Sequence, residues 1–314
     1  MFKKISKILP IIGIILFIYI IINIKFEKIV YAFQQIPIQF YILSLLFLVP
    51  KIILLSIAWQ NICRKQKMNF KLIYLARVYL ISNFYAMVTP AGIGYYTRIY
   101  YLKERSQASW EKCIANTLID TTLNMFTGVF LALIGSIILT KYFPELLPIM
   151  LLFFIFYITL FIVFMKKERG SKIFNVFIRP FIPKKFKEKI DQSVESLYED
   201  LPRVRDLFIP ISIYLVIWLF SGIQVYIMTL AFSININFIM LIFIIIISII
   251  LSDALPISIG GLGVREGILV LLLSAFGVQP QVAFAISLSG YIVKQIIPGL
   301  VGWIYVIKEP IDYS

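Results

Sequence analysis

The sequence predicts an all-α, polytopic membrane protein of about eight transmembrane helices, with additional re-entrant segments that proline and glycine interrupt. Hydrophobic residues make up 61% of the 314 residues, and the mean hydropathy is +0.93. A soluble domain of this length cannot bury so much apolar surface, so lipid must solvate much of it. Charged residues make up only 15% of the chain and are grouped between long apolar runs.

The apolar runs define the candidate spans, because a helix needs about 20 apolar residues to cross the hydrocarbon core. The first run resembles a signal peptide, but no small-residue cleavage site follows it, so we expect a retained first span. The candidate segments are 8–24, 40–62, 73–94, 114–139, 146–165, 208–232, 237–252, 254–278 and 281–307.

Between the candidate spans the sequence leaves no room for a soluble domain. We therefore expect one integral membrane domain over 1–314, with halves of about 1–165 and 208–314. A basic, amphipathic segment over 166–207 joins the halves, and its first part is expected to lie on the membrane surface. Its last part, 188–205, predicts a short amphipathic helix.

Lysine and arginine are unevenly distributed between the loops, which predicts the orientation. The start of the chain and the loops 64–72 and 166–207 are rich in both, whereas 140–145 and 233–236 carry one lysine between them. We expect the basic loops and both termini in the cytoplasm, and the protein in the cell membrane.

This orientation has a consequence for the segment 73–94. Residues 64–72 are cytoplasmic by charge, and 103–113 are cytoplasmic by counting back from 166–207. The segment must therefore enter and leave on the same side, which predicts a re-entrant hairpin turning near Thr89 to Gly94. The alternative is an ordinary span with a kink. Irregular backbone at membrane depth must be covered by protein or line a wet cavity.

A second, similar break interrupts the other half of the chain. Each break has a proline, then spaced glycines, then an arginine, and corresponding interruptions in two halves are typical of transporters built from internal repeats. We expect irregular backbone at Pro90, Gly92, Gly94, Pro256, Gly260, Gly261 and Gly263.

Several charged residues interrupt apolar segments, where charges are expensive and tend to face cavities or partners. As candidate substrate-binding residues we take Lys51, Arg98, Asp120, Asp253, Arg265, Glu266 and Lys294. The cations lie near the glycine breaks or the middle of a span, and helix N-termini there add positive potential. The set predicts a site for an anion with an apolar tail. The alternative for each residue is a structural ion pair between helices.

The residues that are missing also restrict the chemistry. The sequence has no histidine and two widely separated cysteines, Cys63 and Cys113, so we expect no metal site, no cofactor and no histidine proton relay. The net charge of +14 predicts contact with anionic membrane lipids and not with nucleic acid. An oligomer is compatible with the sequence.

Residues Pro256 to Glu266, which read Pro-Ile-Ser-Ile-Gly-Gly-Leu-Gly-Val-Arg-Glu, resemble the signature of the lysylphosphatidylglycerol synthase transmembrane region, a flippase-like family that includes UPF0104-type membrane proteins. Gly290 and the stretch Pro298 to Gly302 extend the resemblance, which covers nearly the whole chain. It implies a helical membrane fold with re-entrant elements and a role in moving lipids between leaflets. Full-length multiple-peptide-resistance factors also carry a cytosolic aminoacyl-transferase domain, which we do not expect here because the chain ends at Ser314.

The sequence thus favours a flippase or scramblase for an anionic phospholipid or a polyprenyl-phosphate-linked lipid, and not an enzyme. One alternative is a membrane-embedded transferase acting on a lipid-linked substrate, with Asp120, Asp253 or Glu266 as the general base. Another is a structural partner of a cell-envelope enzyme.

Overall fold

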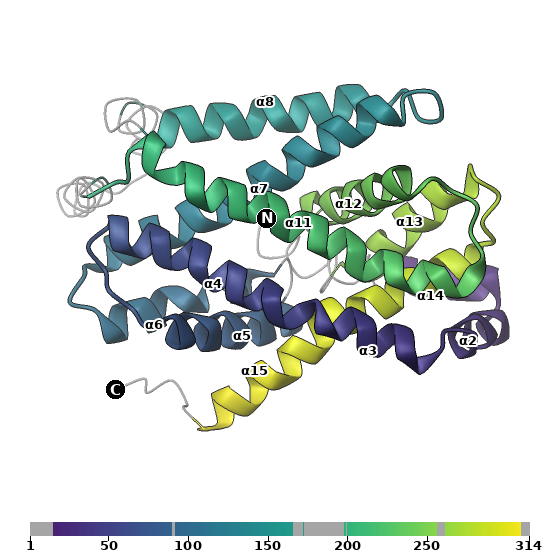
Figure 1. Ribbon diagram of the computed structural model, residues 1–314, viewed down its shortest axis with the longest axis horizontal. Helices are drawn as coiled ribbons and strands as arrows, with labels where there is room; N and C mark the ends of the chain where they lie inside the picture. Colours follow the sequence, from purple (N-terminus) through teal and green to yellow (C-terminus); the bar gives the residue numbers. More distant parts are fainter. Residues whose placement is uncertain are drawn as a thin grey trace.

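The protein is a bundle of helices that lie side by side, roughly along its longest axis (Figure 1). A computed structural model describes residues 15–89, 92–165, 172, 198, 200–255 and 261–308. The helices there that are long and apolar enough to cross a membrane are Ile38–Lys65, Trp110–Ile138, Leu146–Val163, Val204–Phe232 and Pro280–Lys308. Shorter apolar helices are Ile15–Ile24, Leu72–Val88 and Phe238–Ala254. The predicted all-α, polytopic class is confirmed.

The first long span consists of two helices, which the short helix α2 (Phe26–Gln34) precedes. α3 (Ile38–Leu46) and α4 (Leu48–Lys65) meet at Phe47. Pro50 lies in the first turn of α4 and has no N–H to donate, so the regular hydrogen-bond ladder is interrupted there. The residue that follows this interruption is Lys51, whose side chain is buried in the bundle.

The next segment is a helical hairpin made of α5 (Leu72–Val88), the 3₁₀ turn η1 (Ile93–Thr97) and α6 (Arg98–Arg105). A Cβ added to Gly94 would lie 2.2 Å from the backbone of Tyr85, so only glycine allows this close approach. Nearer the open end, the Tyr74 hydroxyl donates a 2.7 Å hydrogen bond to the Tyr101 carbonyl. Early residues of α5 therefore pair with late residues of α6, so the segment turns back on itself as a hairpin, as the sequence predicted.

A long antiparallel pair follows the first hairpin: α7 (Trp110–Ile138) and α8 (Leu146–Phe164). After the linker, η5 (Val204–Leu207), α11 (Phe208–Thr229) and η6 (Leu230–Phe232) form the next span. The final span combines α14 (Pro280–Tyr291), the π-helical turn η7 (Ile292–Ile296) and α15 (Ile297–Lys308).

A second hairpin lies between these two spans and is made of α12 (Phe238–Ala254) and α13 (Val264–Ser274). The sequence predicted a span over 254–278, and this prediction is wrong, because α13 has 11 residues and is only about 16 Å long. The break is local: α12 ends at Ala254, and Gly261 and Gly263, whose φ angles are +76° and +83°, directly precede the start of α13 at Val264.

The two hairpins enter the bundle from opposite ends. α12 packs antiparallel on α7, with Phe243 against Gly135, so it enters from the end where α7 finishes. α6 ends at Arg105, and only four residues separate it from the start of α7 at Trp110. The first hairpin, α5 and α6, therefore occupies the end where α7 begins. The first hairpin packs on α15, where Gly302 lies against Leu80. The second hairpin thus packs on α7, the long helix that follows the first hairpin, and the first hairpin packs on α15, which follows the second. This reciprocal arrangement is typical of inverted repeats.

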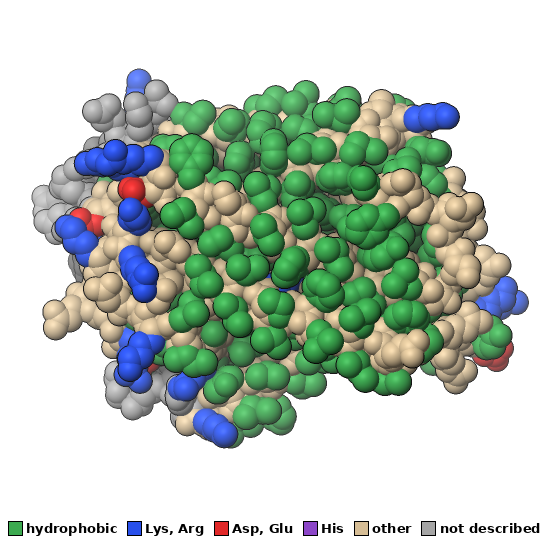
Figure 2. Space-filling view, in the orientation of Figure 1, with side chains coloured by type: hydrophobic (Ala, Val, Ile, Leu, Met, Phe, Trp, Pro, Cys, Tyr) green, Lys and Arg blue, Asp and Glu red, His purple; other side chains and the backbone are tan. Residues whose placement is uncertain are grey.

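The surface separates into an apolar middle and polar ends. Figure 2 shows hydrophobic side chains across the middle and a group of Lys and Arg side chains at the end where α4 finishes. Ion pairs at this end join α4 and α7 to the residues before α11: Lys65 with Asp206 at 2.9 Å, and Lys112 with Asp200 at 2.8 Å. Most of the predicted linker 166–207, including most of the predicted helix 188–205, lies outside the described residues.

Candidate functional site

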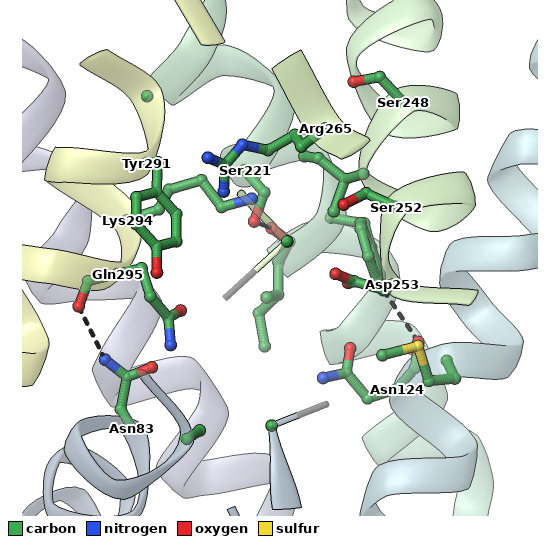
Figure 3. A pocket seen from close by; sticks show the side chains of 18 of the residues that line it. Asn83, Asn124, Ser221, Ser248, Ser252, Asp253, Arg265, Tyr291, Lys294 and Gln295 are labelled. Carbon is green, nitrogen blue, oxygen red and sulfur yellow. Dashed lines mark hydrogen bonds between the residues drawn. The ribbon is translucent and has the colours of Figure 1, made fainter. Parts of the chain in front are cut away.

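A cavity of about 480 Å³ lies in the middle of the bundle, between the two hairpins. Its wall mixes apolar, aromatic and polar side chains from both halves of the chain (Figure 3). Four formally charged residues line it, and all four are sequence-predicted site residues: Lys51, Asp253, Arg265 and Lys294. The backbone candidates Gly92 and Gly261 also line it, whereas Pro90, Pro256 and Gly260 lie outside the described residues.

Lys51 projects from α4, is 7% exposed and donates a 3.4 Å hydrogen bond to the side-chain oxygen of Gln224 on α11. Gln224 is in turn fixed by Ser44, whose hydroxyl donates to its backbone carbonyl at 3.0 Å and whose carbonyl accepts from its side-chain amide at 3.2 Å. The contact between α3 and α11 therefore holds Gln224, a neutral side chain, which in turn orients the Lys51 ammonium group.

Arg265 lies in the first turn of α13 and is held on three sides. Its guanidinium pairs with Glu266, its Nε donates to the Ser287 hydroxyl at 3.4 Å, and its Cζ stacks 4.0 Å from the centre of the Tyr291 ring. Glu266 is 0% exposed and also accepts a 2.7 Å hydrogen bond from the backbone N–H of Gly263. From behind the cavity wall, Glu266 thus caps the helix and anchors the arginine that lines the cavity.

Lys294 lies within the π-helical turn η7, and its side chain lines the cavity. Pro298 explains the irregular turn, since it cannot donate the N–H that a regular α-helix would direct to the Lys294 carbonyl. The neighbouring carbonyl, of Gln295, accepts a 3.1 Å hydrogen bond from the Asn83 amide on α5. The last span is therefore attached to the first hairpin at the level of the cavity.

Asp253 lies in the last turn of α12, before the second break, and its side chain is exposed to the cavity. In Figure 3 it lies across the cavity from Lys294 and Gln295. Lys294 and Arg265 are the cations whose charges act on it. Unlike Glu266, it has no partner at ion-pair distance within the part of the chain that the structure describes.

Besides Glu266, two of the sequence-predicted charged residues lie behind the wall instead of on it. Arg98 is 1% exposed, and its guanidinium pairs with Asp120 on α7 while its Cζ lies 3.9 Å from the Tyr95 ring centre and 4.5 Å from that of Trp59. The other Asp120 oxygen accepts from the Tyr214 hydroxyl. The geometry is that of an internal ion pair, which corresponds to the structural alternative for these residues.

Neutral polar side chains on the cavity wall were not among the predicted site residues. They come from most of the helices around the cavity: Asn83, Asn124, Ser221, Ser248, Ser252, Ser287 and Gln295. Isolated amide side chains inside apolar runs could have indicated these residues, because a buried amide needs hydrogen-bond partners or a wet surface. Within the described residues, no group of three acidic, cysteine or histidine side chains could hold a metal.

Known proteins that resemble this chain include three UPF0104 membrane proteins. A UPF0104 membrane protein of Methanocaldococcus jannaschii is 27% identical, with 98% of this chain and 96% of that protein covered. A second, from Methanothermobacter thermautotrophicus, is 25% identical over 82% of this chain and 78% of its own. A third, from Pyrococcus horikoshii, is 20% identical over 96% of both.

The family comparison agrees with the resemblance seen at the second break. The family model of the lysylphosphatidylglycerol synthase TM region matches residues 7–302, which include both hairpins and every residue that lines the cavity. This multi-pass membrane protein therefore belongs to the lysylphosphatidylglycerol synthase TM region family.

Proposed function

We propose that this protein moves an anionic lipid between the leaflets of the membrane, as a flippase or scramblase. The observation that carries the proposal is the central cavity, in which three cationic side chains lie at mid-bundle depth between hairpins that enter from opposite ends. Charged groups at this depth are costly and are typical of substrate or ion pathways.

The cavity has the two surfaces that a lipid headgroup and its tails require. Lys51, Arg265 and Lys294 offer donors to a phosphate, and the N-terminus of α13 adds the positive end of a helix dipole next to Arg265. Outside the cavity the bundle is apolar, with large exposed side chains such as Leu152 and Phe156 on α8. A headgroup can thus lie in the cavity while its acyl chains stay in lipid.

The opposed hairpins support a route to both leaflets. In transporters built from inverted repeats, substrate sites lie near the midplane where broken helices meet, and one repeat moves against the other around the site. Here both breaks reach the cavity, through Gly92 from one end and Gly261 from the other. A small movement of either hairpin would alter access from its own side.

We propose further that the basic end of the molecule faces the cytoplasm and that the protein lies in the cell membrane. The basic ends of α4 and α6 and the last residues of α15 lie at this end, so the positive-inside rule makes it cytoplasmic and makes the C-terminus cytoplasmic. Cysteine labelling of an introduced residue at Lys308, from outside intact cells, should fail if this orientation is correct.

Reconstitution into vesicles tests the transport proposal. Purified protein is inserted into vesicles with fluorescent phosphatidylglycerol or a labelled polyprenyl phosphate in the inner leaflet, and the loss of fluorescence on adding an external quencher is followed. We expect transport by the wild type and a loss of about tenfold or more for Lys294→Gln. Lys308→Gln, an exposed lysine on the same span, is the matched control. Wild-type vesicles that behave like empty ones for every lipid would overturn the proposal.

One observation favours the transferase alternative as a second candidate. Asp253 is a carboxylate that is open to the cavity, as a general base must be, whereas Asp120 and Glu266 are held in ion pairs. The alternative predicts a covalently altered lipid in cells that express the wild type and none with Asp253→Asn. Mass spectrometry of lipid extracts separates the two functions, because transport alone leaves every lipid mass unchanged.

A further inference from the structure

We propose that the cavity selects a lipid whose headgroup carries one negative charge, as a single phosphodiester does, and that Asp253 sets this preference by cancelling one of the cavity's cations. The inference rests on the proposed function and deepens it, because it names the headgroup class. It follows from the charge inventory of the cavity and from the position of one carboxylate.

The first step is the inventory of formal charges. Three cations line the cavity, namely Lys51, Arg265 and Lys294. Two carboxylates act on them: Glu266, which is bound to Arg265, and Asp253, which lies opposite Lys294. Three positive and two negative groups leave one net positive charge. The stretches 90–91 and 256–260, which flank the cavity in sequence, contain no charged residue and leave the balance unchanged.

The second step distinguishes the two carboxylates. Glu266 is fully buried and is engaged by Arg265, the Gly263 N–H and the Ser287 hydroxyl, so its charge is committed to holding α13 in place. Asp253 is exposed to the cavity and, within the described residues, has no hydrogen-bond or ion-pair partner. A carboxylate without such a partner makes no direct link between helices. Its effect falls on whatever enters the cavity.

The third step is the cost of a charge mismatch. At membrane depth an uncompensated charge is strongly disfavoured, because neither water nor an opposite charge solvates it. A phosphodiester headgroup carries one negative charge and brings the cavity to neutrality. A phosphate monoester carries about two at pH 8, since its second pKa is about 6, and leaves one negative charge uncompensated beside Asp253. A zwitterionic headgroup leaves the net positive charge of the cavity in place.

The neutral wall suits the same class of headgroup. Amide and hydroxyl side chains, including Asn83, Asn124 and Ser248, face the cavity around the cations and can pair with hydroxyl groups. A phosphodiester that bears a polyol or a sugar offers such hydroxyls. This shared chemistry has two sources, a glycerophospholipid and a polyprenyl phosphosugar, and the experiment below uses one probe of each.

The test is a set of competition measurements with the full-length protein in nanodiscs at about pH 8. Two pairs of lipids differ in headgroup charge but share their tails: phosphatidylglycerol against phosphatidic acid, and a polyprenyl phosphohexose against the polyprenyl phosphate. We expect the wild type to bind the diester of at least one pair about tenfold more tightly than the monoester, and phosphatidylcholine weakly. Which pair shows the preference identifies the source.

Asp253→Asn keeps the size of the side chain and raises the net charge of the cavity by one. We expect it to abolish or reverse the preference for the diester. Asp206→Asn, which removes a carboxylate from the surface ion pair with Lys65, is the matched control and should leave the ratio unchanged. Elution as a single species in size-exclusion chromatography checks that each variant is folded.

The outcomes separate the inference from the proposed function. Equal binding of diester and monoester by the wild type, or an unchanged ratio in Asp253→Asn, overturns the inference even if vesicle transport is intact. A preference that shifts in Asp253→Asn, together with no transport of any lipid, supports the headgroup assignment and removes the transport function.

Discussion

The two broken hairpins share a layout and use their arginines in different ways. In the first, Arg98 at the start of α6 is sealed against Asp120 and two aromatic rings, away from the cavity. In the second, Arg265 in the first turn of α13 lines the cavity and stacks on Tyr291. The same sequence motif, a proline with spaced glycines and an arginine, therefore gives one closed site and one open site.

The difference depends on where the partner carboxylate comes from. Asp120 belongs to α7, so its pair with Arg98 crosses between helices and draws the arginine into the bundle. Glu266 follows Arg265 directly in the same helix turn, so the arginine can be paired and still face the cavity. The first hairpin thus uses its arginine for attachment to α7, whereas the second presents its arginine to the cavity, as the proposed function requires.

Removing the carboxylate of the closed site should have the largest effect. Asp120→Ala leaves Arg98 charged and buried without its partner, which typically costs about 3–5 kcal/mol of folding free energy. Thermal unfolding in detergent measures the loss as a lower Tm. The double variant R98M/D120L should be much closer to wild type, because apolar side chains can replace a buried pair. A single variant as stable as wild type would show that the first site is not an attachment.

Filling the close approach in the first hairpin should have the next largest effect. Gly94→Ala brings a methyl group against the backbone of Tyr85, and overpacking of this kind costs about 1–3 kcal/mol. The control is Gly267→Ala in α13, where the nearest atom lies 3.3 Å away on a flexible isoleucine. There alanine's better helix propensity should offset the contact. Limited proteolysis and Tm measurements compare the two variants. Equal losses of stability in both would contradict the distinction between the hairpins.

A cation of the open site should affect binding more than stability. Lys294→Gln is expected to weaken binding of phosphatidylglycerol by about tenfold, or about 1.4 kcal/mol, with little change in Tm, since no ion pair within the described residues is broken. Native mass spectrometry of lipid adducts measures the affinity. A large drop in Tm with unchanged lipid binding would show that this lysine has a structural role, as Arg98 does, and does not bind lipid.

The smallest effect is expected at the basic end, away from both breaks. Hydrogen bonds from Lys112 and Lys67 lower the pKa of Asp200 below its usual value. The pairs therefore stabilise the protein above the unfolded pKa, about 3.9, and the contribution disappears as the pH falls through the folded pKa. Asp200→Asn should cost about 1 kcal/mol or less near neutral pH. Its Tm difference from wild type, measured from pH 7 to pH 3, should shrink toward the acidic end.

The two break regions show how much of the topology local sequence can predict. Loop charges were enough to predict that 73–94 enters and leaves on one side, because the positive-inside rule and parity allow few topologies. For the second half the sequence predicted irregular, re-entrant backbone at the break but also a span over 254–278, and the span is wrong. The segment is apolar enough to cross, and only its short helix α13, packed between α12 and α14, reveals that it turns back.

The sequence by itself determined the bilayer as solvent, the helical class, the positions of both breaks and a set of seven charged candidates that includes the four that line the cavity. These follow from hydropathy, charge spacing and backbone preferences, which are local properties. Only the tertiary structure decided that Arg98 and Asp120 pair behind the wall, that Gln224 orients Lys51, and that Asp253 faces the cavity alone. Those outcomes depend on which helices pack together, because whether a charge is buried and whether it finds a partner are decided by residues distant in the sequence.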